Sequence, residues 1–407
     1  MDLKTSVRTE LSEQLAEARA HTDALFRIVR REALYERPVP ERHRIIFYLG
    51  HLEAFDWNLL GLGALALSSF HPDFDRLFAF GIDPEPGQLP SDVPAQWPEL
   101  EDVHRYNQRV RQILDGAQHE VPEPLLHVAL EHRWMHAETF AYLVHNLSPS
   151  LKLLPPPEFT PAGSAPVCPM IHIPEGLVTL GQKPGVSFGW DNEYDAHQVQ
   201  VPSFTMGKYK VTNGQYLDFV RAGASPPHFW TWREGRWFWR TMAGEILLPL
   251  DWPVYVTFRE ARDYAQWAGK TLPTEAQFHR AAYGTPNGHE QPYPWGTDAP
   301  DHVRGNFDFS SWDPVSVTAT PQGDSAFGVS QLVGNGWEWT STAFHPFPGF
   351  QPFECYPGYS APFFDGEHYV LKGASPRTAA CFLRRSFRNW FRSTYRYVYA
   401  TFRLVGA

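Results

Sequence analysis

A proline-rich segment divides this chain into two parts with different sequence patterns. The segment begins at Ser148 and reads SPSLKLLPPPEFTPAGSAPVCP. Proline fixes φ and has no backbone N–H, so this composition predicts an extended connector that belongs to neither hydrophobic core. A length of 407 residues also exceeds what one core usually organises. We therefore expect two domains, over residues 1–150 and 169–407, joined by a linker over 151–168.

Before the linker, apolar residues recur with the period of an α-helix. This pattern predicts helices in SEQLAEARAHTDALFRIVRREAL and in ERHRIIFYLGHLEAFDWNLLGLGALAL, and two more over about 101–115 and 123–146. These helices are enough for an antiparallel bundle. The stretch from His71 to Pro98 lacks the period and is predicted to be an insertion.

After the linker, short strand-like runs alternate with turns rich in Gly, Pro, Asn and Asp. The run HQVQVPSFTMGKYKVT is an example. One clear helix is predicted over 257–269. The fold class expected for the whole chain is therefore α+β with more than one domain.

Composition and charge favour a small-molecule role. The chain has 35 Lys plus Arg against 45 Asp plus Glu, a formal charge of -10 that argues against nucleic acid or anionic membranes as partners. The amino terminus lacks the apolar region of a signal peptide, and the longest apolar run, 59–67, is too short to span a bilayer. Cysteines at 168, 355 and 381 have no disulfide or zinc-ribbon spacing, so we expect a cytoplasmic protein.

Three histidines are candidate metal ligands. His132 and His136 lie four residues apart on a predicted helix, which places both imidazoles on one face. His51 lies on another predicted helix, and bundle cores are places where facing helices converge on a metal. Three imidazoles would leave coordination positions open for substrate and O2. With 18 histidines in the chain such a pair also arises by chance, and the same ligands suit zinc as well as iron.

Two sets of motifs resemble a known family. The segments FYLGHLEAFDW and EHRWMHAETF resemble the DinB-type helical bundle of the ergothioneine sulfoxide synthases. Four later segments resemble, in order, the formylglycine-generating-enzyme fold, a variant of the C-type lectin fold: NEYDAHQVQVPSFTMGKYKVTNGQYLDFV, WPVYVTFREARDYAQWAGKTLPTEAQFHRAA, LVGNGWEWTSTAF and LRRSFRNWFRSTYRYVYATFRLV. The resemblance covers nearly the whole chain. It implies a DinB-like four-helix bundle followed by a formylglycine-generating-enzyme-like domain.

The resemblance also implies a reaction. Members of this family are iron(II) enzymes that use O2 to join sulfur, or selenium in the related selenoneine synthases, to C2 of the imidazole of hercynine, the trimethylated betaine of histidine. The iron ligands match His51, His132 and His136, and the pair that holds hercynine matches Asn389 and Trp390. An indole face suits a quaternary ammonium group, and an amide can hold the polar end of the substrate.

The chain departs from the family pattern at three places. Phe391 stands where users of gamma-glutamylcysteine carry an acidic residue, and Met135 stands where many members have Gln. No unmistakable motif supplies the catalytic tyrosine. Tyr106 is the best local match, and a phenol near iron could act as a general acid.

Other polar residues have expected roles beside this site. Arg384, Arg385 and Arg388 form a basic cluster suited to a carboxylate or phosphate on the donor. The run GNGWEWTS is a fold signature of the family, in which we expect Asn335, Trp337 and Glu338 to be structural, with a calcium ion as a candidate neighbour.

The absence of an acidic residue at Phe391 favours a donor other than gamma-glutamylcysteine. We expect a selenosugar donor, and hence a selenoneine synthase; the alternative is an ergothioneine sulfoxide synthase that uses cysteine or another thiol. A thiol oxidase of the formylglycine type would need a closely spaced cysteine pair, which Cys355 and Cys381 do not form in sequence. A non-catalytic lectin-like binding module and a zinc-dependent enzyme remain further alternatives.

Overall fold

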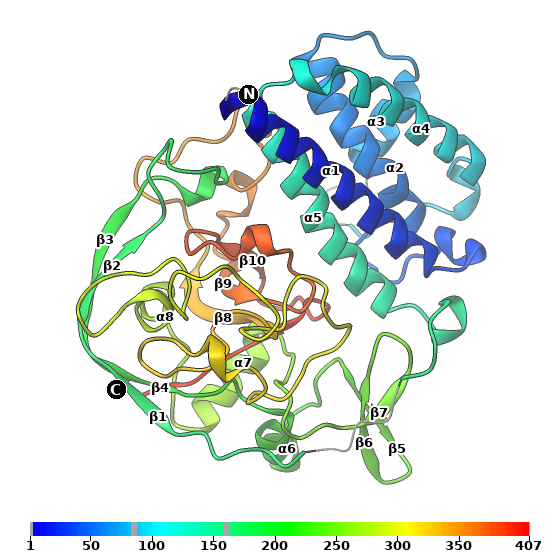
Figure 1. Cartoon of the computed structure of the whole chain (residues 1–407). Coiled ribbons are helices and arrows are strands. Elements are labelled where there is room, and N and C mark those ends of the chain that lie inside the picture. Colours follow the sequence, from blue (N-terminus) through cyan, green and yellow to red (C-terminus); the bar gives the residue numbers. More distant parts are fainter. Residues whose placement is uncertain (1–2, 83–87, 158–162, 407) are drawn as a thin grey trace. The chain divides into compact units, whose positions relative to one another are not determined.

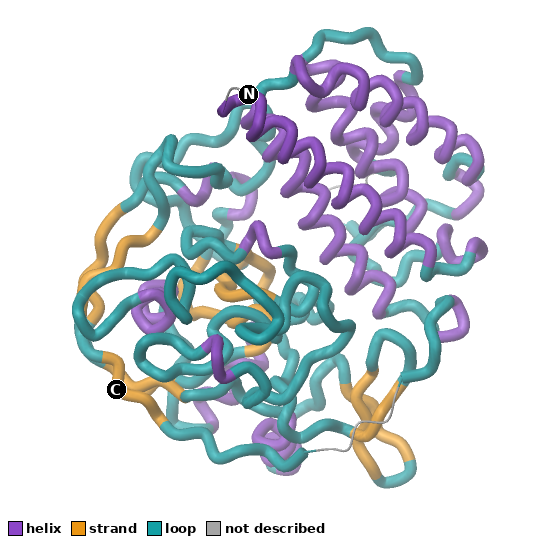
Figure 2. The backbone as a smooth tube through the Cα atoms, viewed as in Figure 1, coloured by secondary structure: helices purple, strands orange, loops and turns teal. Residues whose placement is uncertain are grey.

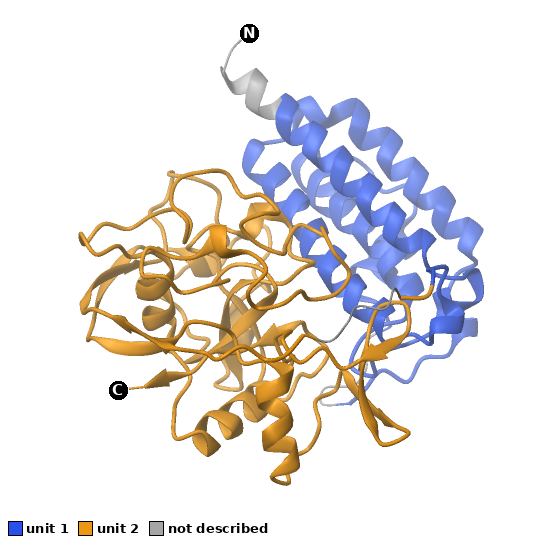
Figure 3. Cartoon of the chain, turned by 60° about the horizontal axis from the view of Figure 1, so that its bottom comes forward, with its two compact units in different colours: residues 1–155 blue, residues 156–407 orange. Residues whose placement is uncertain are grey.

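The chain folds into two compact units, residues 1–155 and 156–407. Figure 3 colours these units separately. The computed structural model describes the backbone of residues 3–82, 88–157 and 163–406. Helices dominate the first unit, whereas strands, short helices and long loops make up the second (Figure 2).

Unit 1 is a helical bundle. Its α-helices are α1 Leu3–Arg27, α2 Ile45–Asp56, α3 Pro72–Phe80, α4 Leu100–Ala117 and α5 Glu123–His145. α1 packs along α5, and α2 packs against α3, α4 and α5 (Figure 1). The bounds of α4 and α5 agree closely with the helices predicted from the apolar period. α2 continues into a π-helical segment, η2 Trp57–Ala64, before the chain turns toward α3.

The helix α3 was missed by the sequence pattern, which predicted an insertion there. The signals that begin it are local: the side chain of His71 caps the helix by accepting from Phe74 N, and Pro72 occupies the first turn. Asp73 and Asp75 add negative charge in the same turn. A helix of 9 residues is too short for the apolar period to stand out.

A buried network of ion pairs ties the helices of unit 1 together. Arg133 of α5 lies 2.8 Å from Asp56 and 3.1 Å from Glu53, both on α2. Arg111 of α4 lies 2.6 Å from the same Glu53, and Arg19 of α1 lies 3.5 Å from Asp56. Buried charges persist where opposite charges neutralise them. The network therefore constrains how α1, α2, α4 and α5 pack.

The first residues of the expected linker pack against unit 1. Lys152 forms an antiparallel bridge with Val29, and Leu153 N donates to Ile28 O. Residues 158–162 of the expected linker lie outside the described residues. None of the described helices combines the length and the apolar character that crossing a bilayer requires.

Unit 2 contains several small sheets. One sheet has the strand order β10–β9–β8–β11, another β1–β4–β12, and β2 pairs with β3, while β5, β6 and β7 form a separate meander. The strands are β1 Met170–Ile173, β2 Gly176–Leu180, β3 His197–Val201, β4 Phe204–Gly207, β5 Trp230–Arg233, β6 Arg236–Arg240, β7 Glu245–Leu247, β8 Gly336–Ala343, β9 His368–Ala374, β10 Asn389–Arg392, β11 Ala400–Thr401 and β12 Val405–Gly406.

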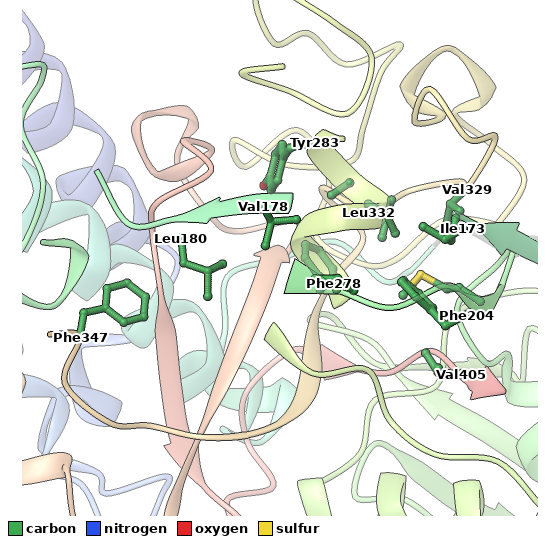
Figure 4. Close-up of a cluster of buried hydrophobic side chains, with 14 residues drawn as sticks. Ile173, Val178, Leu180, Phe204, Phe278, Tyr283, Val329, Leu332, Phe347 and Val405 are labelled. Atoms are coloured by element: carbon green, nitrogen blue, oxygen red, sulfur yellow. The ribbon is translucent and has the colours of Figure 1, made fainter. Parts of the chain in front are cut away.

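A buried apolar cluster joins two of these sheets, β1–β4–β12 and β2–β3, to the helix α8 Glu275–Tyr283. Figure 4 shows Val178 of β2, Phe204 of β4, Phe278 of α8 and Leu332 from a loop, all buried. Alternation of apolar and polar residues puts the apolar side chains of each strand on one face. These faces pack together, so residues from 173 to 405 share one core.

The helices of unit 2 are α6 Asn213–Arg221, α7 Phe258–Trp267 and α8 Glu275–Tyr283. The sequence pattern predicted α7 and missed α6 and α8. Both missed helices begin with a capping box, in which Thr212 pairs with Gln215 and Thr274 with Gln277. The capping residues were therefore a better signal than the apolar period for these short helices.

Candidate metal centre and substrate site

The structure brings the three candidate histidines together inside unit 1. His51 comes from α2, and His132 and His136 come from adjacent turns of α5. One ring nitrogen of each lies within 4.8 Å of the others, and Nε2 of His51 is 3.2 Å from Nε2 of His136. His51 and His132 are buried, and His136 is half-buried. Within the described parts of the chain, no other three His, Cys, Asp or Glu side chains converge in this way.

A backbone carbonyl orients His51. Its Nδ1 lies 2.7 Å from the carbonyl oxygen of Phe78, at the end of α3. A carbonyl can only accept, so Nδ1–H donates and Nε2 carries the lone pair that faces His136. Metal-binding histidines typically donate their other ring N–H in this way.

Burial keeps the imidazoles neutral. Desolvation lowers the pKa of His51 to about 4, although the hydrogen bond to Phe78 opposes it. Desolvation also lowers the pKa of His132 and of His136 well below the ordinary value, and the neighbouring histidines add to this effect. A metal ion binds the neutral imidazole, so these ligands need to lose no proton near pH 7.

The residues present fit a divalent transition metal. Nε2 of His51 and Nε2 of His136 face each other at 3.2 Å, and one ring nitrogen of each of the three histidines lies within 4.8 Å of the others. A cation between these nitrogens would accept their lone pairs, and three imidazoles suit iron or zinc.

Tyr106 lies on α4, where its hydroxyl donates to Oδ1 of Asp75 at 2.7 Å. Burial and this hydrogen bond raise the pKa of the phenol. The hydroxyl proton of Tyr106, which the expected general acid would deliver, is therefore hydrogen-bonded to the carboxylate of Asp75. Sequence reasoning overlooked Tyr48, whose ring centroid lies 5.9 Å from that of His136. Its spacing of three residues from His51 could have placed it on the same helix face.

Met135 and Glu138 lie on α5 beside the ligand pair, and both are half-buried. Met135 occupies the position where many family members carry Gln. Its thioether is a weak acceptor and supplies no hydrogen-bond donor. If the substrate is hydrogen-bonded here, as it is expected to be by Gln in other family members, another residue of this chain has to supply the donor.

In unit 2, the predicted hercynine pair lies on β10. The indole of Trp390 is half-buried and stacks on Phe344, with ring centroids 4.3 Å apart and an interplanar angle of 7°. Tyr359 and Phe363 contact the same indole. Oδ1 of Asn389 accepts from Trp390 N. The indole thus belongs to an aromatic cluster without being fully buried.

Phe391 follows Trp390 on the same strand and stacks on Tyr395, with centroids 5.1 Å apart and an interplanar angle of 13°. The position that is acidic in users of gamma-glutamylcysteine is therefore part of an aromatic pair in this chain. This pair provides no counter-charge for an ammonium group.

The three arginines of the expected basic cluster are each paired with a protein carboxylate. Arg384 binds Glu193, and Arg385 lies 3.2 Å from Glu290. Arg388 is buried and lies 3.0 Å from Glu275. This arrangement differs from the free anion-binding cluster that was expected, and it makes Arg388 a core residue.

Arg384 and Arg385 do line a surface depression of about 420 Å3 in unit 2, together with Lys183 and Ser386. In each pair the arginine is more exposed than its acidic partner: 18% of the Arg384 side chain is exposed against 0% for Glu193, and 33% of Arg385 against 16% for Glu290. These two arginines remain accessible from the solvent side.

Two protein cations pair with Glu338. Lys210 lies 2.7 Å from Oε1 of Glu338, and Arg403 donates to both oxygens of the same carboxylate. Asn335 exchanges hydrogen bonds with the backbone of Val315. The polar atoms of Asn335 and Glu338 are thus engaged by other parts of unit 2.

Among the described residues, Cys168, Cys355 and Cys381 form no disulfide, and none of them joins a group of side chains that could hold a metal ion.

The fold of unit 2 defines the class of this protein. Residues 156–407 match the family model of the sulfatase-modifying factor enzyme 1-like domain. This match confirms the formylglycine-generating-enzyme fold that the C-terminal motifs predicted. It begins where the second compact unit begins.

Curated relatives extend the similarity to the whole chain. The hercynine oxygenase of Mycolicibacterium thermoresistibile is 32% identical over 98% of this chain and 95% of its own length. The hercynine oxygenase of Mycobacterium tuberculosis is 39% identical over 53% of this chain. Ergothioneine biosynthesis protein 1 of Schizosaccharomyces pombe is 28% identical over 93% of this chain. The chain matches only 55% and 54% of the length of these last two relatives. It belongs to the hercynine oxygenase family, which confirms the resemblance to the ergothioneine sulfoxide synthases.

Proposed function

We propose that this chain is an iron(II) enzyme that uses O2 to join selenium, taken from a selenosugar, to C2 of the imidazole of hercynine. The observation that carries the proposal is the group of three neutral, converging imidazoles in a chain similar over nearly its whole length to a hercynine oxygenase. The alternative donor is cysteine or another thiol, which would make the product an ergothioneine sulfoxide.

His51, His132 and His136 would hold the iron, and unit 1 would be a DinB-like bundle. Bound iron would supply the electron-transfer chemistry with O2 that no side chain can perform. The protein keeps the three imidazoles neutral by burial and orients His51 through the carbonyl of Phe78. Phe47, stacked on His51 with centroids 4.8 Å apart, helps to exclude water.

Trp390 and Asn389 would hold hercynine. An indole that is half-buried among Phe344, Tyr359 and Phe363 offers the aromatic surface that attracts a trimethylammonium group. A quaternary ammonium cannot donate hydrogen bonds, so aromatic contacts are its natural partners. The amide of Asn389 can serve the polar end of the same substrate.

The aromatic pair of Phe391 and Tyr395 supports a donor without a free ammonium group at this position. A carboxylate here would attract the charged amino group of gamma-glutamylcysteine, and the chain lacks it. A sugar ring can pack its apolar face on aromatic side chains. This reasoning favours the selenosugar over the dipeptide and leaves cysteine as the competitor.

The first test is metal and hercynine binding. We expect anaerobic protein to bind one Fe(II) per chain and His132→Ala to bind none, because the ligand set becomes incomplete. His127→Ala is the matched control, since His127 lies on the same helix outside the ligand group. Equal iron binding by the wild type and His132→Ala would contradict the proposed site. Absence of both iron and hercynine binding in the wild type would favour a non-catalytic binding module.

The second test identifies the donor. The iron-loaded protein is incubated in air with hercynine and either a selenosugar, cysteine or gamma-glutamylcysteine, and products are identified by mass. A carbon–selenium product from the selenosugar supports the proposal. Product formation with cysteine alone would assign the chain to ergothioneine synthesis instead.

A further inference from the structure

The short helix α3 is coupled to the metal ligand His51 in two ways. The carbonyl of Phe78 accepts from Nδ1 of His51 at 2.7 Å. The ring of the same Phe78 packs against Gly50, the residue before His51, where a Cβ would lie only 2.4 to 2.6 Å from ring carbons. Any shift of α3 along α2 therefore moves the carbonyl that orients His51.

One carboxylate anchors α3. Oδ1 of Asp75 accepts from the hydroxyl of Tyr106 at 2.7 Å, and Oδ2 accepts from Ser69 Oγ at 2.5 Å. The backbone carbonyl of Asp75 accepts from Asn58 Nδ2 at 3.1 Å. Asp75 is buried, so these contacts replace its hydration. Hydrogen bonds to a carboxylate are stronger than those between neutral groups.

α3 needs such an anchor because it is short. Nine residues form a helix that is marginal by itself, and its position depends on tertiary contacts. Tyr106 supplies one of these tertiary contacts, because it lies on α4 and its hydroxyl donates to Asp75 of α3. Its ring also lies 5.5 Å from Phe70 and 5.6 Å from Phe74 between centroids.

We propose that Tyr106 is a positioning residue for the metal centre: its hydroxyl fixes Asp75, Asp75 fixes α3, and α3 presents the Phe78 carbonyl to His51. This inference rests on the proposed metal site and gives Tyr106 a different role from the general acid expected from the family resemblance. The chain of contacts runs Tyr106 Oη, Asp75 Oδ1, the backbone from Asp75 to Phe78, Phe78 O and His51 Nδ1.

The test uses Tyr106→Phe, which keeps the ring packing and removes only the donor to Asp75. Tyr35→Phe is the matched control, because Tyr35 is also in unit 1 and donates to a backbone carbonyl, that of Pro98, at 3.0 Å. Co(II) replaces iron as the probe, since its visible absorption reports ligand geometry without turnover. Affinity, band positions and thermal unfolding are measured for each protein.

We expect Tyr106→Phe to bind Co(II) roughly tenfold more weakly than the wild type, the lower end of the range for lost outer partners of a ligand. Its absorption bands should shift, whereas Tyr35→Phe should match the wild type in both measurements. Ser69→Ala removes the other hydroxyl from Asp75 and should cause a smaller loss in the same direction. This variant tests the anchor even where Tyr106→Phe folds poorly.

Wild-type Co(II) affinity and unchanged bands in Tyr106→Phe, with or without a lower melting temperature, would overturn the inference. Wild-type affinity in Ser69→Ala together with a poorly folded Tyr106→Phe would overturn it as well. A wild-type protein that binds no Co(II) would instead overturn the proposed metal site. The two failures are therefore distinguishable.

Discussion

The ring of Phe55 lies flat on the imidazole of His132, with centroids 3.4 Å apart and an interplanar angle of 8°. Phe55 comes from α2 and His132 from α5, so the contact joins the two helices that carry the candidate ligands. Close stacking restricts rotation of the imidazole about its side-chain torsions. Pre-set ligand orientation should favour metal binding because less rotamer entropy is lost when the ion arrives.

Phe55→Leu should weaken metal binding by less than the roughly tenfold typical of a lost hydrogen-bonded partner, because a freely rotating imidazole can still coordinate. Phe26→Leu is the control, since Phe26 lies in the same unit and packs on the ring of Phe140. Both variants should lose stability by about 1 kcal/mol. Equal metal affinities in the two variants, measured by Co(II) titration, would show that the stacking does not matter for binding.

The stability of unit 1 should depend on the charge of Glu53. Desolvation is the largest single effect and would raise the pKa of Glu53, but Arg133, Arg111 and Arg19 together outweigh it and lower the pKa to about 2. A carboxyl whose folded pKa lies below its ordinary 4.5 stabilises the fold above pH 4.5, and this stabilisation is lost as pH falls toward 2.

Glu53→Gln should therefore be about 3 kcal/mol less stable than the wild type at pH 7, because Arg133 and Arg111 lose a buried counter-charge. The difference should shrink as the pH falls from 4.5 toward 2. Urea unfolding followed by helical circular dichroism measures it. A stability difference that is constant over this pH range would contradict the assignment.

Trp390→Leu should weaken hercynine binding about tenfold, which corresponds to about 1.4 kcal/mol for the lost cation–π contact. Metal stoichiometry should not change, because the candidate ligands lie in unit 1. Trp267→Leu removes an exposed indole from α7 and serves as the control. Calorimetric titration with hercynine measures the effect, and equal affinities in both variants would exclude Trp390 from the substrate site.

Phe391→Asp should raise turnover with gamma-glutamylcysteine relative to cysteine. The substitution restores the acidic residue expected in users of the dipeptide, and its carboxylate can pair with an ammonium group. It also removes the stack on Tyr395, so Phe391→Asn controls for the lost ring. Competition assays with both donors give the ratio, which should rise for the Asp variant and stay low for the Asn variant.

Local patterns predicted the elements that carry the candidate ligands. The apolar period predicted α4 and α5, and the four-residue spacing of His132 and His136 placed them on one face of α5. His51 could be added because facing helices of a bundle converge. Contacts between distant segments could not be predicted in this way. Nothing near Tyr106 in the sequence indicates that its hydroxyl donates a hydrogen bond to Asp75.

The ion pairs of the three arginines also depend on contacts that the local sequence does not show. Arg384, Arg385 and Arg388 are close in sequence and resemble an anion site when read locally. Their partners are Glu193, Glu290 and Glu275, which precede them by many residues and lie beside them only in the folded unit. Pairing between charges on distant segments depends on the tertiary fold. The local sequence shows three arginines close together but does not show the glutamates that neutralise them.

The carboxylate of Glu338 is neutralised by Lys210 and Arg403, both fully buried. The positive charges that balance Glu338 thus come from side chains of the same unit. Formation of these buried ion pairs during folding therefore needs no divalent cation. A strong chelator should therefore leave the Glu338 ion pairs of unit 2 intact, even where it removes a metal ion from the candidate site in unit 1.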